Sequence, residues 1–138
     1  MVKTERISVK TRAGTDLVNI TSLVSKVISD GKIKDGIVVI FVSGSTASVS
    51  TIEYEPNLIK DVNQTLEMIA NSHLEYEHHK TWGDDNGASH VRATLLGPSL
   101  TVPFTNKSLL LGSWQQIILM DFDTKSRNRE IILQIIGE

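Results

Sequence analysis

The sequence predicts a single α+β domain over residues 1–138, in which two to three helices pack on a mainly antiparallel or mixed sheet. Three observations support this fold class. Branched apolar residues alternate with polar residues in several short segments, as in strands. Two other segments repeat apolar residues at helical spacing. The length of 138 residues, with 40% hydrophobic and 22% charged residues, is typical of one soluble globular domain.

The first half of the chain is predicted to contain three strands and two helices. Residues 5–13 alternate as a strand, and a short helix follows with Thr21 as its expected N-cap. Residues 35–44 are apolar on both sides of the pleat, which predicts a central strand covered on both faces, with residues 47–55 as its neighbour. From Pro56 onward, apolar residues fall on one face of a second helix.

The second half is predicted to begin with a long loop over residues 71–86. A short helix over residues 88–96 follows it. Three strand-like segments complete the chain, at residues 99–104, 109–123 and 129–136. The two connections between these segments have hairpin length and turn composition.

The composition excludes several classes of function. The chain has no cysteine, so it has no disulfide, no thiolate nucleophile and no Cys-ligated zinc. Its formal net charge of -2 gives no field that attracts nucleic acid or an anionic membrane. The apolar runs are too short to cross a bilayer, and the N-terminal segment lacks the apolar core of a signal peptide. We therefore expect a cytoplasmic protein with no nucleic-acid or membrane partner.

One window of the chain combines imidazoles with carboxylates: His73, Glu75, Glu77, His78, His79, Asp84, Asp85 and His90. This combination suits a divalent metal ion or general acid–base catalysis near neutral pH. No HExxH or H-x-H pattern is present, and the adjacent His78 and His79 should point apart, so at most one of them is expected to face a site. The alternative is that these are surface loop histidines with ordinary hydrogen bonds.

Three motifs carry a resemblance to a known family: "GSTASVSTIEYEP", "HVRATLLGPSLTVP" and "LGSWQQ". Together they make the chain similar to the YjbQ-type family of small proteins, whose members are often labelled secondary thiamine-phosphate synthases. The resemblance covers nearly the whole chain. It implies a homotrimer and a thiamine-phosphate synthase-like enzyme that acts on a small phosphorylated molecule.

The resemblance also implies a site, through the residues that match the family pattern: Thr46, Ala47, Glu53, His78, Asp84, Asn86, His90 and Arg92. One position departs from this pattern. Many members carry a histidine where this chain has Gly44, so one imidazole of the family pattern is missing here.

Four of these residues are expected to form the chemical centre. His78 and His90 are predicted metal ligands or an acid–base pair, and Glu53 or Asp84 would join them or orient an imidazole. Two imidazoles and one carboxylate would leave an open position on a divalent ion such as Zn²⁺ or Mg²⁺. The alternative for Glu53 is an ordinary charge at a sheet edge.

The remaining residues are expected to bind the phosphate of the ligand. Arg92 and the helix N-terminus at Asn86 could hold a phosphate or diphosphate, and Ser45 and Thr46 could add hydroxyl donors. Alternatively, Asp84 and Asn86 cap the helix and Arg92 forms a salt bridge between subunits.

Other basic and aromatic residues receive weaker interpretations. A basic hairpin tip at Lys125, Arg127 and Arg129 is interpreted as a solvated turn, with attraction of a phosphorylated ligand as the alternative. Trp82 and Trp114 are interpreted as core or interface residues, with stacking on a ligand ring as the alternative.

Two further functions remain open. One is metal-assisted hydrolysis of a small phosphorylated or acyl substrate. The other is a non-enzymatic, trimeric metal- or ligand-binding protein. The number of protein ligands would distinguish them, because structural metal sites are closed by four protein ligands whereas catalytic sites keep a vacancy.

Overall fold

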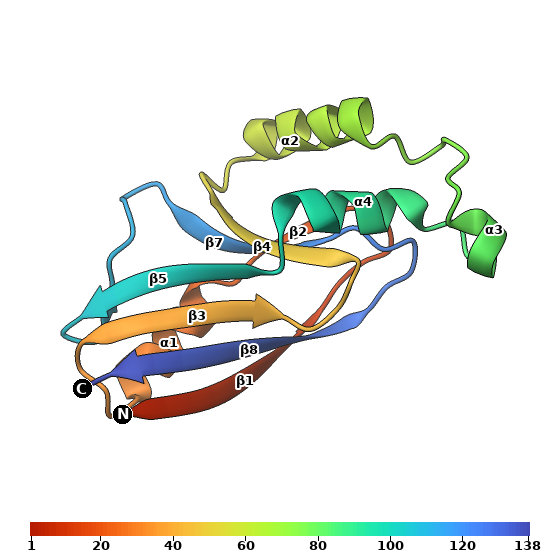
Figure 1. Cartoon of the computed structure of the whole chain (residues 1–138). Helices are drawn as coiled ribbons and strands as arrows, with labels where there is room; N and C mark the ends of the chain where they lie inside the picture. Colours follow the sequence, from red (N-terminus) through yellow and green to blue (C-terminus); the bar gives the residue numbers. More distant parts are fainter.

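The computed structural model describes residues 1–138 as two antiparallel sheets with four helices (Figure 1). The larger sheet consists, in spatial order, of β1 (Val2–Lys10), β8 (Asn128–Gly137), β3 (Gly36–Val42), β5 (Ser99–Thr105) and β6 (Ser108–Leu109). The smaller sheet consists of β2 (Asp16–Asn19), β7 (Gln116–Asp121) and β4 (Ala47–Ile52). The helices are α1 (Thr21–Asp30), α2 (Pro56–Ile69), α3 (His79–Trp82) and α4 (Gly87–Leu96). The predicted single α+β domain is confirmed.

Strand β7 lies at the centre of the packing and is buried on both faces. On one face, Ile117 and Leu119 join the main core, which α1 and the inner face of the larger sheet complete. On the other face, Ile118 and Met120 pack against Leu66 of α2 and against α4. The smaller sheet therefore lies between the larger sheet and the α2–α4 layer.

Strand β3 is covered on one face only, which corrects the expectation that it is buried on both. Val38, Ile40 and Val42 face the main core and are 0% exposed. Ile37 and Phe41 point to the opposite face and are 38% and 39% exposed. The apolar run alone could not separate a strand that another layer of the same chain covers from one whose outer face carries no helix.

The order of the strands corrects two predicted pairings. β4 forms its hydrogen bonds with β7 and not with β3. The connection from β7 to β8 crosses between the two sheets, so it is not a hairpin. The connection from β5 to β6 is a hairpin as predicted, and Asn106 and Lys107 have positive φ angles in its turn.

The helix termini agree with the sequence in part. α2 begins with Pro56 and is capped by the Glu55 carboxylate, which accepts from the backbone N–H groups of Asn57 and Leu58. Thr21 is not the N-cap of α1 but its first residue, and it donates its hydroxyl proton to Asn19. No helix of this fold has the length and the apolar character that a membrane span requires.

Two predicted element bounds and two aromatic residues need correction. Residues 109–123 do not form one strand, because an irregular segment separates β6 from β7. Residues 71–86 are not all loop, because α3 interrupts them. Trp82 and Trp114 are each 75% exposed, so neither is a core residue of the single chain.

Candidate functional site

The candidate site lies where α3 meets α4, at the right-hand end of the molecule in Figure 1. The backbone reverses there through Gly83 and Asp85, which have φ angles of 69° and 57°. The Tyr76 ring packs on Gly87 so closely that a side chain at position 87 would overlap it. The Tyr76 hydroxyl donates to the backbone oxygen of Asn71 at 2.6 Å. These contacts fix the approach of α3 to the first turn of α4.

This reversal brings His78 and His90 together. Their ring centroids are 4.6 Å apart and the rings are inclined by 64°, an edge-to-face arrangement. Nε2 of His78 is buried and has no hydrogen-bond partner, and Asp84 Oδ1 lies 3.8 Å away, beyond hydrogen-bonding distance. A buried polar atom without a partner is costly, so a ligand group that bonded to this nitrogen would gain affinity.

His79, which follows His78 in the chain, contacts Tyr76 and Asp85. Its ring lies edge-on to Tyr76, with centroids 5.9 Å apart. Its Nε2 lies 3.2 Å from Asp85 Oδ1, but the two groups are not aligned as a hydrogen bond. His73 is exposed on the segment between α2 and α3. Only His78 and His90 are therefore paired.

Arg92 is turned away from the histidines and binds groups of the protein. Its side chain is buried, and its Nε and Nη2 donate to the backbone oxygen of Ala70 at the end of α2. Nη2 also donates to Glu67 at 2.9 Å, and Nη1 donates to Thr15 at 2.9 Å. Hydrogen bonds from the backbone and side chain of Ser72, reinforced by Arg92, lower the pKa of Glu67 to about 2. The phosphate-binding role of Arg92 stays a prediction.

A cavity of about 230 Å³ lies beside Arg92. Its charged lining is Glu67, Asp85, Asp123 and Arg92, so three carboxylates face one guanidinium. Glu67 is paired with Arg92 and Asp123 with Arg127, so the lining disfavours a phosphate because it offers no free cation and keeps Asp85. A hollow of about 700 Å³ lies between α1 and β1, away from the histidines.

The structure separates Glu53 from Ser45 and Thr46. Glu53 is exposed beyond the far end of β4, whereas Thr46 immediately precedes this strand. Six residues of extended strand span about 20 Å. Thr46, in contrast, lies near the first turn of α4. Its backbone oxygen accepts a hydrogen bond from the backbone N–H of Phe122, and the carbonyl oxygen of Phe122 accepts one from Ser89 Oγ. The single chain therefore places Ser45 and Thr46 on the side of the α4 N-terminus and Glu53 on the other.

The remaining predicted residues are Asn86 and the metal ligands His78, His90 and Asp84. Asn86 is buried next to α4, but its side chain makes no capping hydrogen bond and its Oδ1 has no partner. The chain contains no group of three or more His, Asp or Glu residues placed to hold a metal ion. A divalent ion at His78, His90 and Asp84 therefore stays a prediction.

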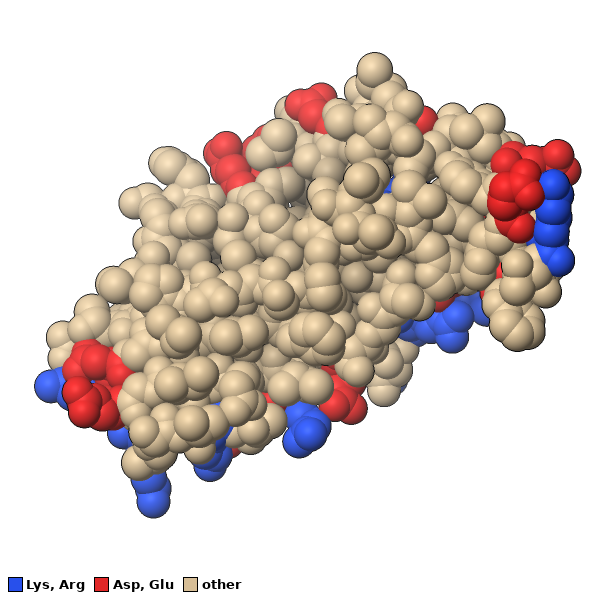
Figure 2. Space-filling view, in the orientation of Figure 1, with Lys and Arg blue, Asp and Glu red and all other residues tan.

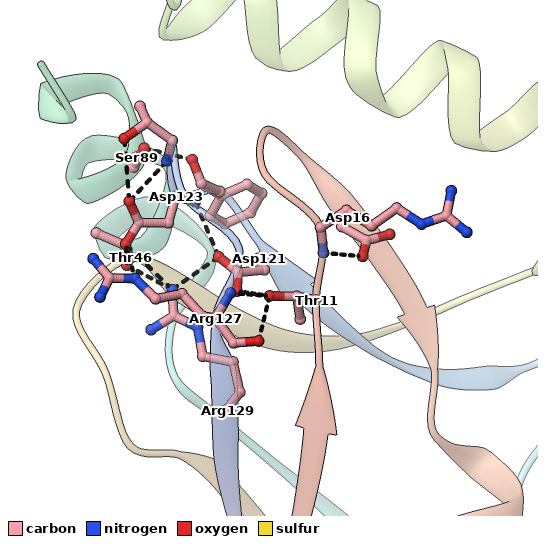
Figure 3. Close-up of polar contacts among 11 residues, drawn as sticks. Thr11, Asp16, Thr46, Ser89, Asp121, Asp123, Arg127 and Arg129 are labelled. Atoms are coloured by element: carbon pink, nitrogen blue, oxygen red, sulfur yellow. Dashed lines mark hydrogen bonds and ion pairs between the residues drawn. The ribbon is translucent and has the colours of Figure 1, made fainter.

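A buried network of charges, absent from the predicted site, lies beside Thr46 (Figure 3). Arg129 binds Asp121 through two hydrogen bonds of 2.7 and 2.8 Å and donates to Thr46 Oγ1 at 2.6 Å. Arg127 Nε donates to Asp123 Oδ2 at 2.9 Å, and Thr46 Oγ1 donates to the same oxygen at 3.0 Å. Arg129 is thus a buried residue and not part of a solvated hairpin tip.

Both carboxylates of this network are held ionised. Burial raises the pKa of Asp121, but hydrogen bonds from Arg129 and Thr11 outweigh it, so the pKa is lowered overall. Burial likewise raises the pKa of Asp123, and Arg127 and Thr46 reverse that effect. The available sequence signal was the i, i+2 spacing of Arg127, just before β8, and Arg129, within it, because this spacing places side chains on one face of an extended segment.

Comparison with known proteins agrees with this structure. The profile of the "UPF0047 protein YjbQ-like" family matches residues 5–138. A UPF0047 protein of Methanothermobacter thermautotrophicus is 36% identical over 137 residues, covering 99% of this chain and 94% of the relative. A UPF0047 protein of Methanocaldococcus jannaschii is 32% identical, covering 96% and 94%.

Solved structures show the same fold. The crystal structure of a YbjQ-like protein of unknown function from Sulfolobus solfataricus has a TM-score of 0.93 and 33% identity, covering 100% of this chain and 99% of that one. A YjbQ/UPF0047 protein from Clostridium acetobutylicum has a TM-score of 0.86 and 29% identity, covering 96% and 99%. Because the family profile and these relatives both span almost the whole chain, the protein belongs to the YjbQ-like UPF0047 family.

Proposed function

We propose that this protein is an enzyme that acts on a small phosphorylated substrate by proton transfer at the His78–His90 pair. One observation carries the proposal: two separate segments, α4 and the residue preceding α3, bring these imidazoles to a centroid distance of 4.6 Å. The buried Nε2 of His78 has no hydrogen-bond partner in the protein. A thiamine-phosphate synthase-like reaction, implied by the family resemblance, is the first candidate.

The geometry supports general acid–base chemistry best. Two neighbouring imidazoles can divide the roles of proton acceptor and proton donor near neutral pH. Asp84 Oδ1 lies 3.8 Å from His78 Nε2 and is the carboxylate beside the pair. In a thiamine-phosphate synthase-like reaction, a thiazole nitrogen bonds to a pyrimidine methylene carbon while pyrophosphate leaves. A protonated imidazole would neutralise charge on that leaving group.

Two alternative functions use the same residues. In a metal-assisted hydrolase, His78, His90 and Asp84 would hold a divalent ion such as Zn²⁺ or Mg²⁺ and the ion would activate water. In a non-enzymatic protein, the ion or a small ligand would be bound without turnover. The single chain contains no group of three His, Asp or Glu residues placed to hold such an ion.

The test compares His78→Asn and His90→Asn with His73→Asn, a control at an exposed histidine outside the site. Purified proteins are assayed for thiamine phosphate formation from its two precursors and for turnover of a panel of phosphorylated metabolites. We expect turnover to fall about 100-fold or more in the two site variants and to be unchanged in the control. Full activity in both site variants would reject the proposal.

Metal analysis of the same proteins separates the alternatives. A stoichiometric ion that both site variants lose, together with hydrolytic turnover, would favour the metal-assisted hydrolase. An ion or ligand bound without turnover of any substrate would favour the binding protein. Activity that survives chelation and depends on both histidines is the result expected from proton transfer.

We also propose that the protein forms a homotrimer through the outer face of the larger sheet. Ile37, Phe41 and Ile136 are exposed there, and β3 and β8 place them on neighbouring strands. Figure 2 views this face and shows Lys, Arg, Asp and Glu confined to its margins. An uncharged apolar face of this kind is typical of a subunit interface.

A further inference from the structure

We propose that the β3–β4 loop at Gly44 and the start of β8 form an oxyanion subsite, in which Arg129 and Arg127 bind a phosphate group. The phosphorylated nature of the natural ligand rests on the function proposed above. The subsite itself rests on the neighbouring guanidinium groups of Arg127 and Arg129, which share Asp123 Oδ2, and on the open space that Gly44 leaves beside Arg129. It differs from the predicted phosphate site at Arg92 and corresponds to the alternative interpretation of Lys125, Arg127 and Arg129.

Arg129 has one donor edge that the protein leaves free. Its Nε and Nη2 are bonded to Asp121 and Thr46, whereas its Nη1 donates to no group of the protein. This Nη1 lies 2.7 Å from the position that a Cβ atom on residue 44 would take. Gly44 and Ser45 are exposed, so the absence of a side chain at position 44 leaves Nη1 open to a ligand.

Arg127 adds a second free guanidinium edge. Its Nε is bonded to Asp123 Oδ2 at 2.9 Å, and Arg129 Nη2 lies 3.8 Å from the same oxygen. The shared oxygen keeps the two guanidinium groups close together, as Figure 3 shows. The Arg127 side chain is 45% exposed, and its terminal Nη groups have no protein partner. The two free Nη groups of Arg127 and the free Nη1 of Arg129 are N–H donors that suit the oxygens of a phosphate.

The charges of the network favour an anion at its outer surface. Asp121 and Asp123 are buried beneath the arginines and are already bonded to them, so they fix the guanidinium groups in place. Exposed Lys125 adds positive charge nearby on the same connection. Arg92, by contrast, uses every nitrogen on protein groups and lines a cavity with three carboxylates. Arg129 and Arg127 are therefore the better phosphate ligands.

The subsite lies on the same side of the molecule as the histidine pair. Thr46, the partner of Arg129, is linked through Phe122 to Ser89 in the first turn of α4. His90 is the next residue along that helix. A phosphorylated substrate held at the arginines could thus extend toward the imidazoles.

The test measures the binding of inorganic phosphate to the full-length protein by isothermal titration calorimetry at low ionic strength. Gly44→Ala inserts a methyl group against Arg129 Nη1, and Arg127→Gln removes the second guanidinium. Gly112→Ala is the matched control, because its added Cβ would meet only ordinary contacts at 3.6 Å or more. We expect phosphate affinity to fall about tenfold in the first two variants, as for a lost charged hydrogen bond, and to be unchanged in the control.

Two results would overturn the inference: no saturable phosphate binding by the wild-type protein, or wild-type affinity in Arg127→Gln. Urea denaturation of Gly44→Ala shows whether that variant is folded, and Arg127→Gln keeps the test decisive if it is not. The same measurements distinguish failure of this inference from failure of the proposed function. His78→Asn and His90→Asn should retain phosphate binding, so full turnover in those variants would reject the proton-transfer role alone.

Discussion

Asp121 and Arg129 form a bidentate ion pair inside the protein, with Nε–Oδ2 and Nη2–Oδ1 distances of 2.7 and 2.8 Å. Asp121 is the last residue of β7 in the smaller sheet, and Arg129 lies near the start of β8 in the larger sheet. Thr11 donates to Asp121 from the end of β1, and Thr46 accepts from Arg129 just before β4. The pair therefore joins both sheets at the edge that leads to the candidate site.

The first prediction concerns this pair. Asp121→Asn leaves a buried guanidinium without its carboxylate and should lower the free energy of unfolding by about 3–5 kcal/mol. Urea denaturation measures the change. Asp30→Asn is the control, because its ion pair with Lys26 is exposed and should have little effect. A loss below about 1 kcal/mol in Asp121→Asn would contradict a structural role for the pair.

The second prediction uses the pKa of Glu67, which is lowered from 4.5 to about 2 in the folded protein. A lowered folded pKa means that the ionised carboxylate stabilises the fold above the unfolded pKa. This stabilisation should be lost as the pH falls from about 4.5 toward 2. Glu67→Gln should be less stable than wild type at pH 7, and the difference should vanish in acid.

Thermal unfolding across this pH range gives the measurement for Glu67. Glu77→Gln is a suitable control, since its ion pair with Lys80 is exposed. If the stability difference between wild type and Glu67→Gln were the same at pH 2 and pH 7, ionisation of Glu67 would not stabilise the fold.

The third prediction separates structure from ligand binding at Arg92. Arg92→Ala removes the hydrogen bonds that tie α4 to the end of α2 at Ala70 and Glu67. We expect a lower unfolding temperature and faster amide hydrogen exchange at the end of α2, but unchanged affinity for phosphate. Arg6→Ala, which breaks an exposed pair with Glu130, serves as the control. Loss of phosphate binding in folded Arg92→Ala would show that Arg92 is the phosphate-binding residue after all.

The fourth prediction tests the closeness of β3 and β8. A methyl group added to Gly36 would overlap the backbone oxygen of Ile136, which has no rotamer to change. Gly36→Ala should therefore cost about 2 kcal/mol or more in urea denaturation. Gly112→Ala has room for its methyl group and should change stability little. Equal stability of the two variants would show that the strands can separate at no cost.

The fifth prediction concerns assembly. Phe41→Glu places a charge in the middle of the uncovered sheet face and should dissociate the proposed trimer. Met68→Glu is the control, because Met68 is 85% exposed on α2, away from that face. Light scattering after size-exclusion chromatography measures the mass of each variant. An unchanged mass in Phe41→Glu, or a monomeric wild type, would place the interface elsewhere or remove it.

Local signals in the sequence predicted the elements well where one face is apolar and the ends are marked. The helix that begins at Pro56 and the turn at Asn106 and Lys107 are examples, because proline and short polar turns restrict the backbone. The outer face of β3 was misjudged for a related reason. A branched apolar residue favours a strand whether it is covered by the same chain or left exposed.

The segment from His73 to His90 shows that local patterns are equally limited at the candidate site. The residue types at His78 and His90 were visible in the chain, and so was the expectation that at most one of His78 and His79 faces a site. Their pairing depends on the reversal through Gly83 and Asp85 and on the packing of Tyr76, which no local pattern specifies.

The sequence by itself determined the family, the α+β class and the residue types available for chemistry, because these follow from local periodicity and from matching motifs. Only the tertiary structure decided which charged groups meet. Arg92 and Arg129 are the same kind of residue, yet one binds the end of α2 and the other leaves a donor edge open beside Gly44. The physical reason is that the partners of a buried charge come from strands and helices far apart in the chain, and folding alone brings them within hydrogen-bonding distance.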